Sequence, residues 1–317
     1  MGKYIYEGVK DFNLDHIFDC GQCFRWSRQE DGSYTGIAMG KAVNVSLKEV
    51  PAGEGSGADG TCGPGEGQPR LESGKFQPRL DLVIDNCSKE DFEKIWRSYL
   101  DLDRDYGAIK ATLAESDQVM AKAIEGGSGI RILKQELWET MVSFIISQNN
   151  NIPRIKGCIE NLARLFGEPA GEYSGVEYFN VPSAEVMSGL TAEDLAPCRL
   201  GYRAPYLVET ARQVMERGGV EAVAADLEAA RTPEEACEYL RGFQGVGPKV
   251  ASCIALFGLG RLEAFPIDVW VRRVMNRLYG IDEKDIKGMN AYAAEHFGVN
   301  GGIAQQYLFY YIRSLDD

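Results

Sequence analysis

The chain has 317 residues, 44% of them hydrophobic, and a formal net charge of −13 at pH 7. It is long enough for one large or two medium domains with real cores, and no apolar run is long enough to span a membrane. The acidic balance counts against a surface that is basic throughout, as many nucleic-acid-binding proteins have. Polar and acidic residues interrupt the N-terminal segment, so we expect no secretory signal and an intracellular protein.

The N-terminal region predicts an antiparallel sheet. Short runs rich in β-branched and aromatic residues, separated by polar turns, have the composition of strands at 23–26, 34–38, 42–47 and 80–84. Residues 51–78 interrupt them with eight glycines and four prolines and few large apolar side chains. We predict that this segment is a flexible insertion in a β-hairpin.

From residue 88 onward the pattern becomes helical. Ser88 and Asp91 have the spacing of a capping box that opens a helix through Ser98. Apolar spacing and capping residues predict further helices at 135–148, 152–167, 203–217, 232–242, 249–258, 269–279, 283–296 and 302–314. The predicted fold class is α+β, with an N-terminal antiparallel sheet domain over 1–116 and an all-α domain over 117–317.

The cysteines predict neither a metal site nor a disulfide framework. Eight cysteines are scattered along the chain, and only Cys20 and Cys23 form a C-x-x-C pair. A zinc site would need a second ligand pair, and the chain has two histidines. The C-terminal region also lacks the four closely spaced cysteines of an iron–sulfur cluster. We expect reduced thiols and no bound metal.

The segment Gly245-Val246-Gly247-Pro248-Lys249 carries the clearest chemical signal. It lies between two predicted helices, and its glycines allow backbone N–H groups to approach a phosphate, so we predict phosphate contacts at Gly245, Gly247 and Val250. Pro248 suits the first position of the second helix. Lys249 then lies in the first turn, where the helix dipole disfavours a positive charge and favours a nucleophilic amine.

Asp268 lies nineteen residues after Lys249, and its simplest role is to cap the next helix. Between Arg241 and Arg277 six basic residues oppose two acidic ones, whereas 221–238 holds six acids and one arginine. These numbers predict one basic face on an acidic body, with salt-sensitive binding to a polyanion.

The hairpin with its lysine and aspartate resembles the helix–hairpin–helix DNA glycosylases. Further motifs are similar to those of the 8-oxoguanine DNA glycosylases and follow the family's order from residue 12 to residue 313. They are Gly21-Gln22-Cys23-Phe24-Arg25-Trp26, Asn149-Asn150-Asn151-Ile152-Pro153-Arg154, Gly201-Tyr202-Arg203-Ala204-Pro205-Tyr206 and Ala304-Gln305-Gln306-Tyr307-Leu308-Phe309. Trp270 departs from the family, which often has a histidine two residues after the aspartate.

The resemblance implies a DNA glycosylase with AP-lyase activity that flips 8-oxoguanine out of the duplex. Lys249 would attack C1′ of the deoxyribose and form a Schiff base, and Asp268 would stabilise the developing cationic sugar. β-Elimination would then cut the strand 3′ to the lesion. No organic cofactor is implied, and a structural cation beneath the hairpin carbonyls is consistent with the family.

The resemblance also implies that the carbonyl of Gly21 accepts a hydrogen bond from N7–H of 8-oxoguanine, a donor that guanine lacks. Gln305 would contact the Watson–Crick edge, and Phe309 and Cys253 would stack on the two faces of the base. Without the resemblance, Phe309 would be assigned to core packing.

The other strand has its own set of predicted contacts. Asn149, Arg154 and Arg203 would face the cytosine left behind, because its free N3 and O2 accept from guanidinium donors. Tyr202 would act as a wedge in the base stack. The resemblance implies that the partner is double-stranded DNA that contains oxidised guanine, and we expect a monomer that does not bind a membrane.

Two alternatives stay open at this point. One is a glycosylase of other specificity, for oxidised pyrimidines or adenine. The other is a non-catalytic helix–hairpin–helix module, for which the hairpin backbone alone would suffice.

Overall fold

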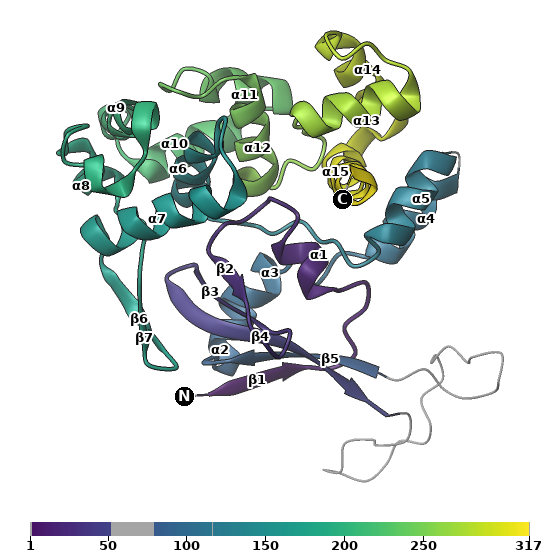
Figure 1. Ribbon diagram of the computed structural model, residues 1–317, viewed down its shortest axis with the longest axis horizontal. Coiled ribbons are helices and arrows are strands. Elements are labelled where there is room, and N and C mark those ends of the chain that lie inside the picture. The colour runs from purple at the N-terminus through teal and green to yellow at the C-terminus, as the bar shows by residue number, and fades with distance from the viewer. Residues whose placement is uncertain (1, 52–78, 116, 317) are drawn as a thin grey trace.

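The computed structural model describes residues 2–51, 79–115 and 117–316. Its N-terminal part is a five-stranded antiparallel sheet with the order β1-β5-β4-β3-β2 (Figure 1). The strands are β1 (Lys3–Tyr6), β2 (Trp26–Arg28), β3 (Tyr34–Ala38), β4 (Lys41–Val50) and β5 (Arg79–Asp85). The predicted insertion at 51–78 falls between β4 and β5 in the sequence and, beyond Pro51, lies outside the described residues.

One predicted strand is shorter than expected. The run at 23–26 enters the sheet only at Trp26. The residues before it bend around Gln22, a fully buried side chain whose amide donates to the carbonyl of Arg131 and accepts from the N–H of Leu133. The polar side chain in this bend therefore forms hydrogen bonds with a segment distant in the sequence and not with a neighbouring strand.

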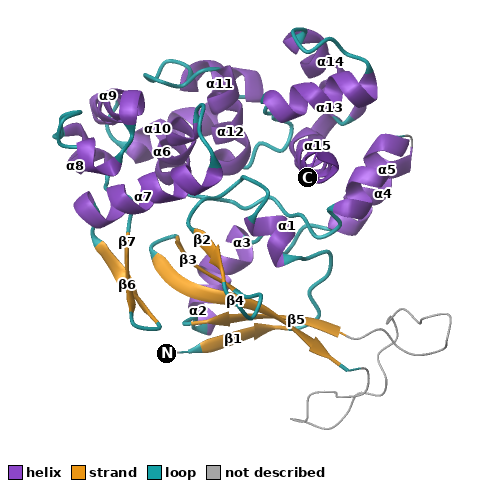
Figure 2. Ribbon diagram, viewed as in Figure 1, coloured by secondary structure: helices purple, strands orange, loops and turns teal. Residues whose placement is uncertain are grey.

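Helices lie together on one side of the sheet (Figure 2). The predicted capping box is present, because Oγ of Ser88 accepts from the N–H of Asp91 and the Asp91 carboxylate accepts from the N–H of Ser88. The helix that it opens runs as α2 (Lys89–Asp91), a π-helical turn (Phe92–Trp96) and α3 (Arg97–Tyr99). The other predicted helices are α6 (Leu137–Ser147), α7 (Ile152–Phe166), α9 (Ala204–Glu216), α11 (Pro233–Leu240), α12 (Pro248–Leu259), α13 (Val269–Tyr279), α14 (Ile286–His296) and α15 (Gly301–Asp316).

The predicted architecture is confirmed, and the structure adds elements that the sequence patterns did not reveal. These are β1, α1 (Leu14–Phe18), α4 (Tyr106–Glu115), α5 (Gln118–Gly126), α8 (Ala184–Ser188), α10 (Val220–Ala229) and a hairpin of β6 (Pro169–Tyr173) and β7 (Val176–Phe179). The helical domain is therefore not entirely helical. Its hairpin reaches down beside the sheet and contacts β4 (Figure 1).

The two hydrophobic cores interleave along the chain. Tyr106 and Leu113 precede the predicted boundary at 116 but pack in the core of the helical domain, whereas Leu133 follows it and packs in the core of the sheet domain. The helices α4 and α5 on either side of the boundary pack against each other, and α5 packs on α15. The division at 116 stays a prediction.

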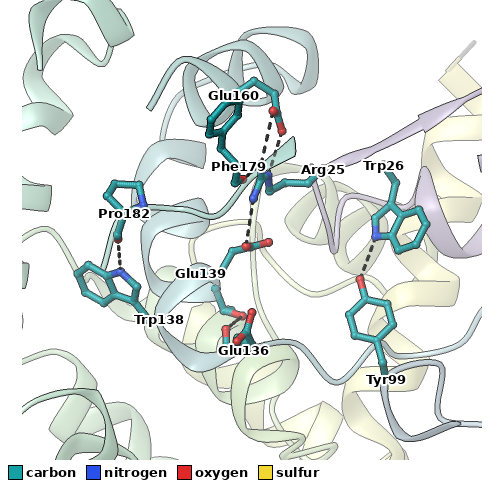
Figure 3. Close-up of polar contacts among 10 residues, drawn as sticks. Arg25, Trp26, Tyr99, Glu136, Trp138, Glu139, Glu160, Phe179 and Pro182 are labelled. Carbon is teal, nitrogen blue, oxygen red and sulfur yellow. Dashed lines mark hydrogen bonds and ion pairs between the residues drawn. The ribbon is translucent and has the colours of Figure 1, made fainter. Parts of the chain in front are cut away.

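A buried arginine joins the two domains (Figure 3). The Nε of Arg25 pairs with Glu160 of α7 at 2.9 Å, and its Nη1 lies 3.5 Å from Glu139 of α6. Its Nη2 donates to the carbonyl of Phe179 in β7 at 2.7 Å. One guanidinium therefore fixes the turn before β2 against three elements of the helical domain, which sets where Gly21 stands relative to α12 and α15.

Candidate active site

The predicted helix–hairpin–helix is formed by α11, a short turn and α12. Gly245 has φ +80°, and a Cβ there would lie 2.8 Å from the side chain of Tyr206, so no other residue fits without displacement. At Gly247 a Cβ would meet nothing within 4 Å, which leaves its backbone open on that side. Gly247 is the N-cap of α12 and Pro248 its first residue, as predicted. The exposed end of α12 therefore presents amide groups suited to a phosphate.

A small cavity brings together the residues predicted to act on the lesion base. Its volume is about 40 Å³, and it is lined by Cys20, Gly21, Phe144, Lys249, Cys253, Phe257, Pro266, Asp268, Gln305, Gln306 and Phe309. The lining comes from the turn before β2, from α6 and α12, from the segment before α13, and from α15. Six of the residues predicted from the sequence, spread over 289 positions of chain from Gly21 to Phe309, thus share one site.

The cavity is narrow in this conformation. A Cβ on Gly21 would lie 3.4 Å from the ring of Phe309, so the glycine and the ring nearly touch across the opening. A volume of about 40 Å³ holds roughly three water molecules. A purine therefore enters only if a wall moves, and the half-buried Phe309 is the side chain that closes the gap.

Lys249 is the only cationic side chain among the described residues that line the cavity. Its Nζ lies 5.0 Å from the centroid of the Phe144 ring, within the range of a cation–π contact. Burial raises the pKa of the Cys253 thiol, and Lys249 beside it opposes that shift. Burial also raises the pKa of Cys20 to about 12. Both thiols stay protonated near neutral pH, so neither is a thiolate nucleophile in this cavity.

Asp268 and Gln305 are both held in fixed orientations. One carboxylate oxygen of Asp268 accepts from the N–H of Val271 at 2.8 Å and caps α13, as predicted. The side chain of Gln305 is buried, and its Oε1 accepts from Nε2 of Gln306 at 2.8 Å. A second hydrogen-bonding group of each side chain remains for the cavity.

The residues predicted to face the opposite base form a second cluster around the turn at 148–151. Asn149 and Arg154 are exposed there, and Tyr202 is 50% exposed. Arg203 differs from the expectation because it is 2% exposed. Its guanidinium donates to the backbone carbonyls of residues 148 and 149. In this conformation Arg203 holds the turn and does not present itself to DNA.

Five lining residues were not assigned to the site from the sequence, and two of them are Cys20 and Pro266. Phe144, Phe257 and Gln306 line the cavity beside the predicted residues. Phe144 and Phe257 stack with ring centroids 5.4 Å apart. Each lies in a strongly apolar helix, where the sequence pattern does not distinguish a residue that lines a pocket from a residue of the core. Gln306 had a signal, since an amide next to the predicted Gln305 in an apolar helix needs a partner.

The basic face predicted after Asp268 lies on α13, where Arg272, Arg273 and Arg277 are exposed. The guanidinium of Arg273 lies 4.9 Å from the centroid of the Trp270 ring. Trp270, which departs from the family, therefore holds a cationic side chain at this end of the helix. In the described parts of the chain, no helix is long and apolar enough to cross a bilayer. Within those same parts, no cluster of His, Cys, Asp and Glu could hold a metal ion.

Family comparisons agree with this geometry. Residues 5–141 match the N-terminal domain of 8-oxoguanine DNA glycosylase, and residues 142–297 match the HhH-GPD superfamily of base excision DNA repair proteins. The chain is 31% identical to a probable N-glycosylase/DNA lyase of Methanothermobacter thermautotrophicus, over 77% of this chain and 81% of that protein. It is 32% identical to the N-glycosylase/DNA lyase of Saccharomyces cerevisiae, over 84% of this chain and 68% of that protein.

A solved structure extends the match to the whole chain. The 8-oxoguanine glycosylase/lyase of Clostridium acetobutylicum, in complex with double-stranded DNA containing cytosine opposite to 8-oxoguanine, superposes with a TM-score of 0.82 at 38% identity. The alignment covers 99% of each chain. By sequence over most of its length and by fold over all of it, the chain belongs to the 8-oxoguanine DNA glycosylase family of HhH-GPD base excision repair proteins.

Proposed function

We propose that this DNA glycosylase and lyase excises 8-oxoguanine that stands opposite cytosine in duplex DNA. The observation that carries the proposal is the convergence of Lys249, Asp268 and the predicted base contacts on one cavity. DNA binds to the amides of the hairpin and the arginines of α13, and the oxidised base rotates out of the stack into the cavity. The protein acts as a monomer inside the cell.

The chemistry begins when the ring of Phe309 moves away from Gly21 and admits the base. The amine of Lys249 attacks C1′, the bond from C1′ to N9 breaks, and the base leaves with a proton. The carboxylate of Asp268 stabilises the positive charge that develops on the sugar. The amine gives up a proton, the bond from C1′ to O4′ then breaks, and O4′ takes up a proton, which leaves a protonated Schiff base between C1′ and Lys249. This Schiff base acidifies the protons on C2′, and loss of one of them expels the 3′ phosphate and cuts the strand.

Selection of the base depends on Gly21, Gln305 and Phe309. The carbonyl of Gly21 accepts from N7–H of 8-oxoguanine, whereas guanine would set its N7 acceptor against that carbonyl. The amide of Gln305 contacts the Watson–Crick edge. On the other strand Asn149 and Arg154 contact the unpaired cytosine, and Arg203 joins them once it leaves the turn.

A structural cation at the hairpin would share two of its carbonyls with side-chain donors. The carbonyl of Gln244 accepts from the hydroxyl of Thr210 at 2.6 Å, and that of Gly245 accepts from the amide of Gln148 at 2.9 Å. Each carbonyl oxygen keeps a second lone pair, and no step of the proposed reaction depends on a cation.

Borohydride trapping tests the proposal. The protein is incubated with duplexes that contain one 8-oxoguanine or one guanine opposite cytosine, and the Schiff base is reduced. We expect a covalent adduct with the lesion duplex alone, and none from Lys249→Gln protein that still binds the lesion duplex. Adduct formation by the mutant at the wild-type level would assign the nucleophile to another residue.

A further inference from the structure

The C-terminal end of α6 meets both the hairpin and the opposite-base cluster at Gln148. The last carbonyls of a helix have no partner within the helix. The side-chain amide of Gln148 supplies one, because Nε2 donates to the carbonyl of Ile145 at 3.0 Å. The same nitrogen donates to the carbonyl of Gly245 in the hairpin at 2.9 Å, across 97 positions of chain. Gln148 therefore ties α6 to the part of the protein suited to bind a phosphate.

The backbone carbonyl of Gln148 faces the other way. It accepts from the hydroxyl of Tyr202 at 3.1 Å and from Nε of Arg203 at 2.9 Å. Arg203 also donates to the carbonyl of Asn149 at 2.9 Å. Asn149 has φ +46°, in the left-handed region that asparagine adopts more readily than most other residues. The conformation of the opposite-base turn thus depends on bonds that converge on the successive carbonyls of Gln148 and Asn149.

We propose that Gln148 is a positioning residue. It couples the phosphate contacts that the hairpin makes with the lesion strand to the contacts that the turn at 148–151 makes with the opposite base. Its side chain is fixed by Gly245, and its carbonyl fixes Tyr202 and Arg203. The packing of α6 against both α12 and α9 places these two connections on neighbouring elements (Figure 1). A shift of the hairpin on binding a phosphate therefore reaches Asn149 and Arg203 through this residue. The inference rests on the proposed function.

The chain offers a matched control in Thr210. Its buried hydroxyl donates to the carbonyl of Gln244, the residue before Gly245, from the middle of α9. Thr210→Val and Gln148→Met each remove one side-chain donor from the hairpin and keep the size of the side chain. Of the two variants, only Gln148→Met changes a residue that is itself part of the opposite-base turn.

Single-turnover excision is measured for wild type and both variants with 8-oxoguanine opposite cytosine and opposite adenine. We expect Gln148→Met to lower the ratio of the two rates about five-fold, the factor that corresponds to one hydrogen bond. Thr210→Val should change both rates by the same factor and keep the ratio. Tyr202→Phe, which keeps the ring and loses only the bond to the Gln148 carbonyl, should lower the ratio in the same direction without unfolding the protein.

Amide hydrogen exchange gives a readout that does not require catalysis. Gln148→Met should accelerate exchange both in the hairpin at 242–247 and in the segment 199–203, whereas Thr210→Val should affect the hairpin alone. An unchanged rate ratio in both Gln148→Met and Tyr202→Phe, or exchange at 199–203 that stays at the wild-type rate, would overturn the coupling. A wild-type protein without excision would refute the proposed function instead, and the exchange experiment would still decide the role of Gln148.

Discussion

Asp268 is placed to serve both the fold and the reaction, and two substitutions separate these roles. Its carboxylate caps α13 through a 2.8 Å bond to the N–H of Val271, and it also lines the cavity with Lys249. Asp268→Asn keeps an oxygen acceptor for the cap and loses the charge. Loss of the charge costs about 0.3–1 kcal/mol at the helix N-terminus. Asp268→Ala loses cap and charge together, which costs about 1–2 kcal/mol or a few degrees in Tm.

The reaction should respond differently from the fold. Removal of one electrostatic group that stabilises a transition state typically slows the step about 10²–10³-fold. We therefore expect both variants to lose excision to a similar extent in single-turnover assays, although Asp268→Asn melts close to wild type and Asp268→Ala melts lower. Wild-type excision by Asp268→Asn would refute the electrostatic role. Equal melting of the two variants would refute the capping role.

Three further predictions follow from other sites. Arg154→Met should flatten the preference for cytosine over adenine opposite the lesion more than it slows excision opposite cytosine, and rates that stay in the wild-type ratio would contradict this contact. Gly21→Ala should abolish excision in a folded protein, because φ +75° costs an alanine about 1 kcal/mol or more and its Cβ would lie 3.4 Å from the Phe309 ring; unchanged excision would show that this opening does not admit the base. Burial raises the pKa of Glu139 from 4.5 to about 7, so the folded protein retains this proton and its free energy of unfolding should fall as pH rises through that interval. The side chain is 21% exposed and pairs with Arg25, so we expect a decline of about 1–3 kcal/mol, measured by melting at several pH values and flattened in Glu139→Gln.

The parts of the site that local rules determine were predictable from the sequence. The hairpin glycines, Pro248 at the start of α12 and the cap by Asp268 each follow from backbone geometry within a few residues. The insertion at 51–78 was also recognisable as a segment with little apolar surface, although it lies mostly outside the described residues. The family's motifs then indicated which separated residues share a pocket, which spacing alone could not do.

Other features depend on contacts across the fold and had no local signal. Arg203 was assigned to DNA, but two backbone carbonyls of the turn at 148–151 accept its donors and keep it buried. Gln148 was predicted as the last residue of a helix at 135–148, and its contact with Gly245 appears only when α6 and the hairpin lie side by side. The sequence patterns did not predict the hairpin β6–β7, because both strands are short and partly exposed and β6 contains Gly171.

The distribution of charge on the protein affects how it approaches DNA. With a net charge of −13, the body of the protein repels DNA at a distance, and the exposed arginines of α13 attract it only near the hairpin. Screening at physiological salt confines both effects to about 8 Å. Weak non-specific binding is the expected result, with a stable complex only where the cavity accepts a base and the turn at 148–151 accepts its partner. We therefore expect discrimination to come from the short-range contacts of these two clusters, with the global charge limiting the time spent on undamaged DNA.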